Sequence, residues 1–112
     1  MIPIPPVVGD PAGMRAFAGS LRTLAAQLSD YEAELTGLVR GMTFEGPAGT
    51  EFAERMASFG RRLADGASRL EGLAGRIMVA ADRVEEEIRA RERLIEELNR
   101  QMAQAVAGAG GP

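Results

Sequence analysis

Residues 14–42 read MRAFAGSLRTLAAQLSDYEAELTGLVRGM, and their large apolar side chains recur at alternating steps of three and four. This period places the side chains on one stripe of an α-helix, whereas a β-strand would alternate every two residues. The stripe consists of Met14, Phe17, Leu21, Leu24, Leu28, Tyr31, Leu35, Leu38 and Met42. An unbroken stripe of this kind is typical of a coiled coil or a helical bundle, so we expect an all-α protein.

The ends of this first helix are marked by residues with known preferences for helix termini. Asp10 is a suitable N-cap, and Pro11 fits the first helical position because its missing N–H would have no partner there. Gly41 can supply a left-handed cap at the other end, so we expect the helix over 11–41. Residues 1–9 contain three prolines, which predict an extended Pro-rich arm.

A second, longer apolar stripe follows a turn that we expect over 42–47. We expect the second helix over 47–106, a flexible tail over 107–112, and one helical hairpin over 10–106. The second helix should pair with the first as far as Ile77, and about 25 further residues should have no partner within the chain. The hairpin seam on this helix comprises Met56, Phe59, Leu63, Leu70, Leu73 and Ile77.

Small residues form another row beside the seam of the second helix, and small side chains let a neighbouring helix approach closely. We expect this row to face a partner, together with three apolar residues of the unpaired end. The partner-facing set is Ala53, Ala57, Gly60, Ala64, Ala67, Ala74, Ala81, Ile88, Ile95 and Leu98. Two helices alone bury little surface, which favours a four-helix-bundle dimer of antiparallel hairpins. The alternative is a monomer with an exposed Ala-rich face.

The composition argues against catalysis and against several classes of ligand. The chain has no Cys and no His, and all thirteen basic residues are Arg. The commonest general base, the commonest metal ligands and the lysine of phosphate-binding loops are therefore missing. The net charge of −3, with both signs interleaved, provides no basic stripe for nucleic acid. We expect a non-enzymatic protein without cofactor or metal, and without membrane insertion.

The turn carries the most distinctive motif of the chain. It reads Met42-Thr-Phe44-Glu45-Gly46-Pro-Ala48-Gly-Thr-Glu-Phe52-Ala. This segment resembles the turn of the small W-x-G (Esx) family of type VII secretion, which runs Trp-x-Gly-x-Ala with a Phe four residues after the Ala. Phe44 stands in the place of the Trp, Glu45 is the variable residue, and Gly46, Ala48 and Phe52 keep their places. The resemblance covers roughly residues 14–90.

The resemblance implies a protein that is exported folded, without a cleavable signal peptide, and that is cytoplasmic before export. It implies a partner that is itself or a related hairpin protein, and contacts with a type VII ATPase or a larger secreted protein. Family members that carry an export signal have Tyr-x-x-x-Asp/Glu after the second helix. The only Tyr here is Tyr31, followed four residues later by Leu35. The chain would then be the signal-less partner in a heterodimer, or a homodimer with another export determinant.

Two further readings stay open at this stage. Phe44 is either a hydrophobic plug at the end of the hairpin or part of an export recognition surface, and one role does not exclude the other. The whole chain is alternatively a cytosolic coiled-coil adaptor or assembly subunit that docks through the unpaired end of its second helix.

Overall fold

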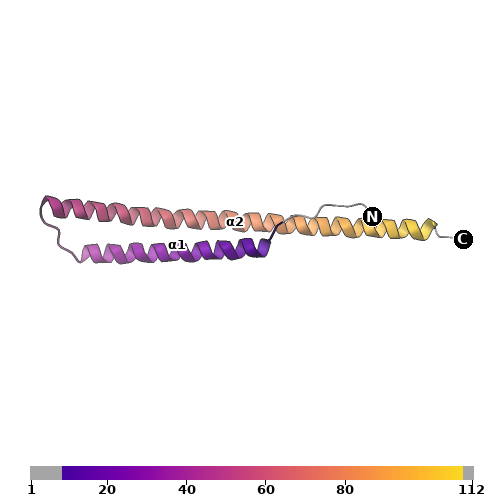
Figure 1. Ribbon diagram of the computed structural model, residues 1–112, viewed down its shortest axis with the longest axis horizontal. Coiled ribbons are helices and arrows are strands. Elements are labelled where there is room, and N and C mark those ends of the chain that lie inside the picture. The colour runs from indigo at the N-terminus through magenta and orange to yellow at the C-terminus, as the bar shows by residue number, and fades with distance from the viewer. Residues whose placement is uncertain (1–8, 110–112) are drawn as a thin grey trace.

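The computed structural model describes residues 9–109, which form two helices joined by a short turn (Figure 1). Helix α1 spans Pro11–Arg40 and helix α2 spans Gly46–Ala109, with no strand between residues 9 and 109. The expected all-α hairpin with a long second helix is therefore confirmed as a fold. Apart from Gly9, the expected Pro-rich arm lies outside the described residues.

The start of α1 agrees with the sequence-based expectation, and its end does not. The Asp10 carboxylate accepts a hydrogen bond of 3.0 Å from the N–H of Gly13, and Pro11 is the first helical residue. At the other end Gly41 has φ −79° and ψ −6°, which is right-handed backbone, so the predicted left-handed cap is wrong. The N–H of Gly41 still bonds to the carbonyls of Gly37 and Leu38, which continues the helical pattern by one residue.

The positive φ that the turn requires falls at Gly46 instead. Its φ of 71° is the one left-handed value within the described chain, and only glycine adopts it without strain. Pro47 follows at once and fits the first turn of α2, where an N–H would have no helical partner. At the far end α2 continues to Ala109, because alanine favours helix. The expected tail over 107–112 is therefore wrong for its first three residues, Ala107 to Ala109.

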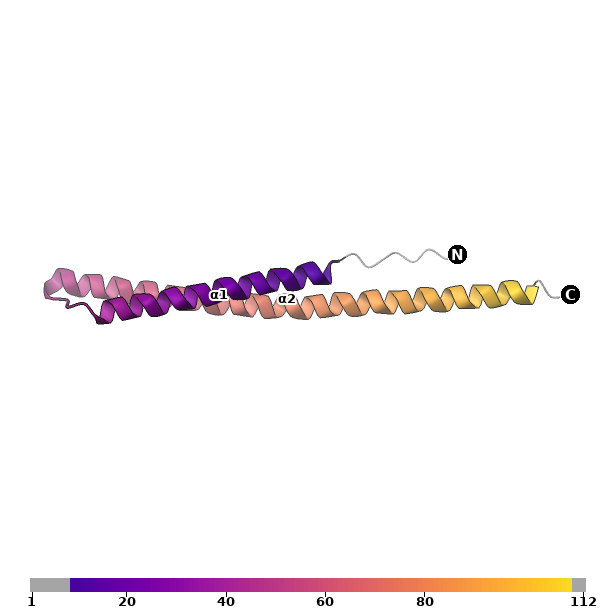
Figure 2. The ribbon, with the colours of Figure 1, turned by 90° about the horizontal axis from the view of Figure 1, so that it is seen from below.

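The two helices run antiparallel and lie side by side along the whole of α1 (Figures 1 and 2). The guanidinium of Arg15 lies 2.8 Å from Asp82 and 2.5 Å from Glu85, while Leu28 lies beside Gly66. These contacts show which segments of α1 and α2 lie side by side. They also extend the pairing to Glu85, beyond the expected limit at Ile77. The remainder of α2, residues 86–109, has no neighbouring helix among residues 9–109 and is about 36 Å long at 1.5 Å per residue.

The contact between α1 and α2 is built from small residues flanked by half-buried large ones. The fully buried positions recur every seven residues and are all Ala or Gly: Ala18, Ala25, Gly60, Ala67, Ala74 and Ala81. Beside them lie the half-buried side chains Met14, Leu21, Leu28, Leu35, Met56, Leu63, Leu70 and Ile77. Within residues 9–109 no large side chain is fully buried. Small residues on both helices let the two backbones approach closely.

This arrangement corrects one part of the sequence-based assignment. Gly60, Ala67, Ala74 and Ala81 were expected to face a partner, but they are buried between α1 and α2. On α1 the contact uses two adjacent rows of side chains. One row is large and half-buried, Met14, Leu21, Leu28 and Leu35, and the other is small and buried, Ala18 and Ala25. The bulky row that begins at Phe17, on the other side of Met14, is therefore turned away from α2.

Candidate functional site

The main surface feature of the hairpin is an exposed row of large apolar side chains. On α1, Phe17 is 56% exposed, Tyr31 is 58% exposed and Leu38 is 68% exposed, although all three were expected in the hairpin seam. Similar side chains on α2 are also exposed. We call the combined set the apolar flank, and it comprises Phe17, Leu24, Tyr31, Leu38, Phe52, Phe59 and Leu73.

The two halves of the apolar flank lie on the same side of the hairpin. Phe17 immediately precedes the buried Ala18, and Phe59 immediately precedes the buried Gly60. In a pair of antiparallel helices, two residues that each precede a buried interface residue by the same number of positions lie on the same side of the pair. The opposite side illustrates the rule, because Arg15 and Glu85 each follow a half-buried residue by one position and are in contact there.

The apolar flank is large for the surface of a single small chain. Roughly half of each side chain is exposed, and an aromatic side chain carries about 150–250 Å² in all. The flank therefore exposes on the order of 600 Å² of apolar surface, which matches the largest patch on a typical monomer. Apolar patches of this size on single chains are often functional.

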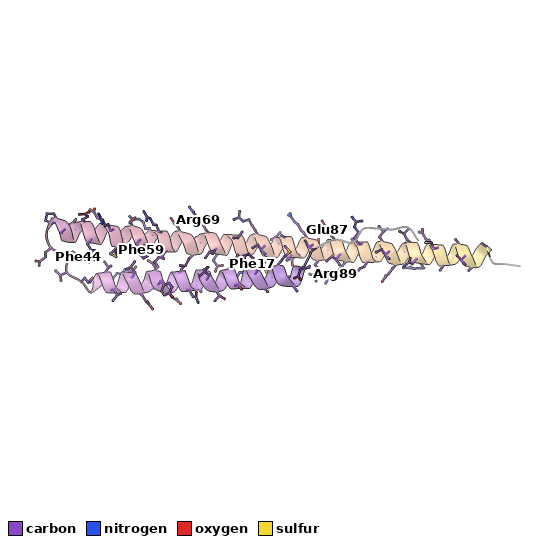
Figure 3. The ribbon with its side chains drawn as sticks, viewed as in Figure 1. Phe17, Phe44, Phe59, Arg69, Glu87 and Arg89 are labelled. Carbon is purple, nitrogen blue, oxygen red and sulfur yellow. The ribbon has the colours of Figure 1, made fainter. Side chains whose placement is uncertain are left out.

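Charged residues of opposite sign border the two edges of the apolar flank. The edge on α2 carries an arginine every seven residues: Arg55, Arg62, Arg69, Arg76 and Arg83. Figure 3 shows Arg69 among them, on the side of α2 away from α1. Arg55 bonds to Glu51 of its own helix at 2.6 Å, and the other four form no ion pair with any residue of 9–109.

The edge on α1 is acidic rather than basic. Glu34 lies three residues after Tyr31, in the position that Arg62 occupies relative to Phe59, and Asp30 lies directly before Tyr31. Both carboxylates are exposed, and neither forms an ion pair within the described part of the chain. The apolar flank is thus bordered on α2 by arginines and on α1 by carboxylates that form no ion pair within residues 9–109.

The motif at the turn lies at the end of the hairpin where α1 and α2 are joined (Figure 3). Phe44 is half-buried, and its ring lies 5.6 Å from that of Phe52 between centroids, with 38° between the planes. Gly49 favours this packing, because a Cβ there would lie 3.2 Å from the carbonyl carbon of Phe44, which is a tight contact. Glu45 and Ala48 are exposed. Phe44 therefore covers the first turns of α2 and connects the turn to the apolar flank through Phe52.

Replacing Phe44 by Ala is expected to lower the free energy of unfolding by about 1–2 kcal/mol, because a half-buried ring loses about half the contacts of a core Phe. Thermal melting followed by circular dichroism should show a decrease of several degrees. Met42→Ala is the matched control, since Met42 lies in the same turn but is mostly exposed. Equal melting temperatures for the two variants would mean that the Phe44–Phe52 contact does not hold the turn.

The side of the hairpin opposite the apolar flank is polar at one end and lined by small residues at the other. Hydrogen bonds from the Arg15 guanidinium to Asp82 and Glu85 raise the pKa of Arg15, so it stays charged. Near the turn a shallow groove of about 310 Å³ includes the small residues Ala57 and Ala64 in its lining. Both were expected to face a partner and are exposed, while Ala53 is half-buried.

The unpaired end of α2 is a second exposed surface. Ile88, Ile95 and Leu98 are half-buried against their own helix, and further along the helix Met102 is exposed. Ion pairs within the helix support this segment, one between Arg89 and Glu85 at 3.1 Å and one between Arg100 and Glu97 at 3.4 Å. The position of Arg89 and Glu87 beyond the start of α1 is visible in Figure 3. The three residues expected to face a partner have no neighbouring helix within the described part of the chain, residues 9–109.

The chemistry available on these surfaces is that of packing and ion pairing. Among residues 9–109 no three acidic side chains gather into a potential metal site, and neither helix has the length and apolar composition needed to cross a bilayer. Comparison with protein-family models, with curated proteins and with solved structures finds no match for this chain.

Proposed function

We propose that this protein is a non-enzymatic hairpin of the W-x-G-like type VII secretion class, exported folded as a substrate or as the partner of a larger substrate. It acts by binding a second helical hairpin. The observation that carries the proposal is the apolar flank, which runs from Phe17 to the aromatic turn at Phe44 and Phe52. A surface of this extent on a two-helix chain is suited to completing a four-helix bundle.

The turn supports the secretion part of the proposal. Its Phe-x-Gly-x-Ala sequence begins in the turn and ends in the first turn of α2, and Gly46 adopts the positive φ that restricts the position to glycine. The Phe44 ring packs on Phe52, which joins the two aromatic positions of the motif in one cluster. Such a cluster at the end of a rigid rod is a compact feature for an export apparatus to recognise.

A cytosolic coiled-coil adaptor is the second candidate function, and the projecting end of α2 favours it. That segment carries Ile88, Ile95, Leu98 and Met102 without a neighbouring helix in the structure. A partner helix would bury this row, as in a coiled coil. The two functions place the protein in different compartments, so localisation separates them.

Export is expected to depend on the type VII ATPase of the native host. The tagged protein should be present in culture filtrate of the wild-type strain and absent from filtrate of a strain without the ATPase. Quantitative immunoblots of filtrate and lysate, together with a cytosolic marker for lysis, make this measurement.

The Phe44→Ala variant extends the same assay to the turn. If the turn is recognised, the variant should remain in the lysate even under conditions where it is folded by circular dichroism. Protein retained in the lysate of both strains, with the lysis marker absent from the filtrates, would reject the secretion proposal and favour the adaptor.

A further inference from the structure

We propose that residues 1–8, the proline-rich segment before α1, pack along the unpaired end of α2 and cover its apolar row. We call the segment in this position the strap. It closes the surface that a partner helix of an adaptor would use, so such a partner has to displace it. The strap is independent of export. Its support comes from the position of Gly9, from the side chains along α2, and from the length and composition of the segment.

Gly9, the first residue that the structure describes, lies directly on α2. A Cβ at Gly9 would be 2.6 Å from Cγ1 of Val84, which is closer than side chains normally approach, so the backbone of Gly9 passes over Val84. Val84 is half-buried and lies just before the unpaired end, residues 86–109. Residues 1–8 are therefore joined to the hairpin at the start of the surface that no helix of residues 9–109 covers.

The direction of α1 favours the same course for the residues that precede it. Because α1 and α2 run antiparallel, the space beyond the start of α1 lies alongside the later residues of α2 (Figure 1). Asp10 has φ −128° and ψ 83°, a non-helical conformation of the kind expected before Pro11. Three prolines among residues 1–8 favour continued extension, which carries the segment toward the end of α2 rather than back toward the turn.

The side of α2 that contacts α1 continues along the unpaired end, but its side chains become larger. Where α1 lies on it, the buried row that recurs every seven residues is Gly or Ala: Gly60, Ala67, Ala74 and Ala81. Beyond α1 the same spacing reaches Ile88, Ile95 and Met102. A helix is about 10–12 Å across with its side chains, whereas neighbouring extended chains lie only about 4.8 Å apart. The larger side chains are therefore suited to a neighbour thinner than a helix.

Residues 1–8 lie outside the described range 9–109, but their length and composition match this surface. They read MIPIPPVV, and every side chain is apolar, so whichever edge of the segment faces α2 is apolar. Polyproline geometry advances about 3.1 Å per residue, so the segment extends about 25 Å beyond Gly9. That length equals about 17 residues of helix counted from Val84, which takes in Ile88, Ile95 and Leu98. The prolines also lack an N–H, so packing on an apolar surface leaves fewer donors without a partner.

Disulfide formation tests the position of the strap, because the chain has no cysteine of its own. Ile4 is expected about 15 Å beyond Gly9, near the level of Ile95. The Ile4→Cys/Ile95→Cys variant should form a disulfide within one chain under mild oxidation, seen as loss of free thiols at single-chain mass. Ile4→Cys/Arg93→Cys is the matched control, since Arg93 is exposed at nearly the same level on the opposite side of α2. Its thiols should pair at least about ten-fold more slowly, because they are held beyond disulfide distance.

Two outcomes of the disulfide experiment would overturn the strap. Equal rates of pairing in the two variants would mean that residues 1–8 keep to no particular side of α2. A disulfide-linked species of doubled mass would mean that the segment packs on another copy of the chain instead. Neither result decides export, which the ATPase experiment measures separately.

Hydrogen exchange of the backbone amides in residues 88–98 gives a second test that needs no cysteine. Removal of residues 1–8 should raise the exchange rates there about ten-fold, the change expected when burial of one large apolar side chain is lost. Ile4→Asp/Val7→Asp keeps the length and the prolines and should have the same effect. The amides of residues 63–74, which α1 covers, are the internal control and should exchange at unchanged rates. Unchanged rates over residues 88–98 in both variants would overturn the strap.

Discussion

Replacing Ala25 by Glu is expected to abolish the folded hairpin at room temperature. Ala25 is 1% exposed and belongs to the buried row that packs against α2, and this row consists of Ala and Gly only. An unpaired charge at such a position costs several kcal/mol, which is comparable with the whole stability of a small domain. The variant should lose most of its helical signal in circular dichroism.

Ala26→Glu provides a closely matched control, because Ala26 is the next residue and is exposed. Glutamate is nearly as good a helix former as alanine, so this variant should melt within a few degrees of wild type. Comparison of the two melting curves therefore tests which side of α1 faces α2. Equal melting temperatures would place the Ala18–Ala25 row outside the helix contact, contrary to the structure.

If the apolar flank binds a second hairpin, as proposed, replacing Tyr31 by Glu is expected to break that complex while leaving each chain helical. Tyr31 is 58% exposed in the single hairpin, so a polar residue there costs the hairpin little. In the proposed complex the change removes a buried ring and adds an unpaired charge. We expect the dissociation constant to rise at least about 100-fold, since burial of one large side chain contributes about 1.5–3 kcal/mol.

Sedimentation across a range of concentrations would measure this shift, with circular dichroism as the check on folding. Ala33→Glu is the control, because Ala33 is exposed on the other side of α1 and should leave the complex intact. A Tyr31→Glu variant that still sediments as the wild-type complex would exclude the apolar flank as the interface.

The sequence was sufficient to predict the helices and most of their ends. The steps of three and four in residues 14–42 identify helix without reference to any other part of the chain. The caps at Asp10 and Pro11 are local effects, as is the restriction of Gly46 to glycine, and all three were predictable. Gly41 was assigned a left-handed conformation in error, because a neighbouring glycine in the same turn supplies it.

The side of each helix that forms the hairpin contact was not predictable from apolar period alone. Three adjacent rows of side chains on α1 begin at Met14, Phe17 and Ala18. The Met14 row lies between the other two, and it could form the helix contact together with either of them. Apolar size favoured the Phe17 row, whereas the structure uses the Ala18 row. The deciding factor is the distance between helix axes, which depends on matching small residues on α2. That information is spread over residues 60–81 and carries little hydropathy signal.

The absence of a fully buried large side chain between residues 9 and 109 has a consequence for the heat capacity of unfolding. That quantity scales with the apolar area exposed when a chain unfolds, and it is reduced where the large side chains of the helix contact are only half-buried. A single hairpin should therefore have a shallow stability curve and a broad thermal transition. Any association that buries the large apolar side chains would add to the heat-capacity change and make the melting temperature rise with protein concentration.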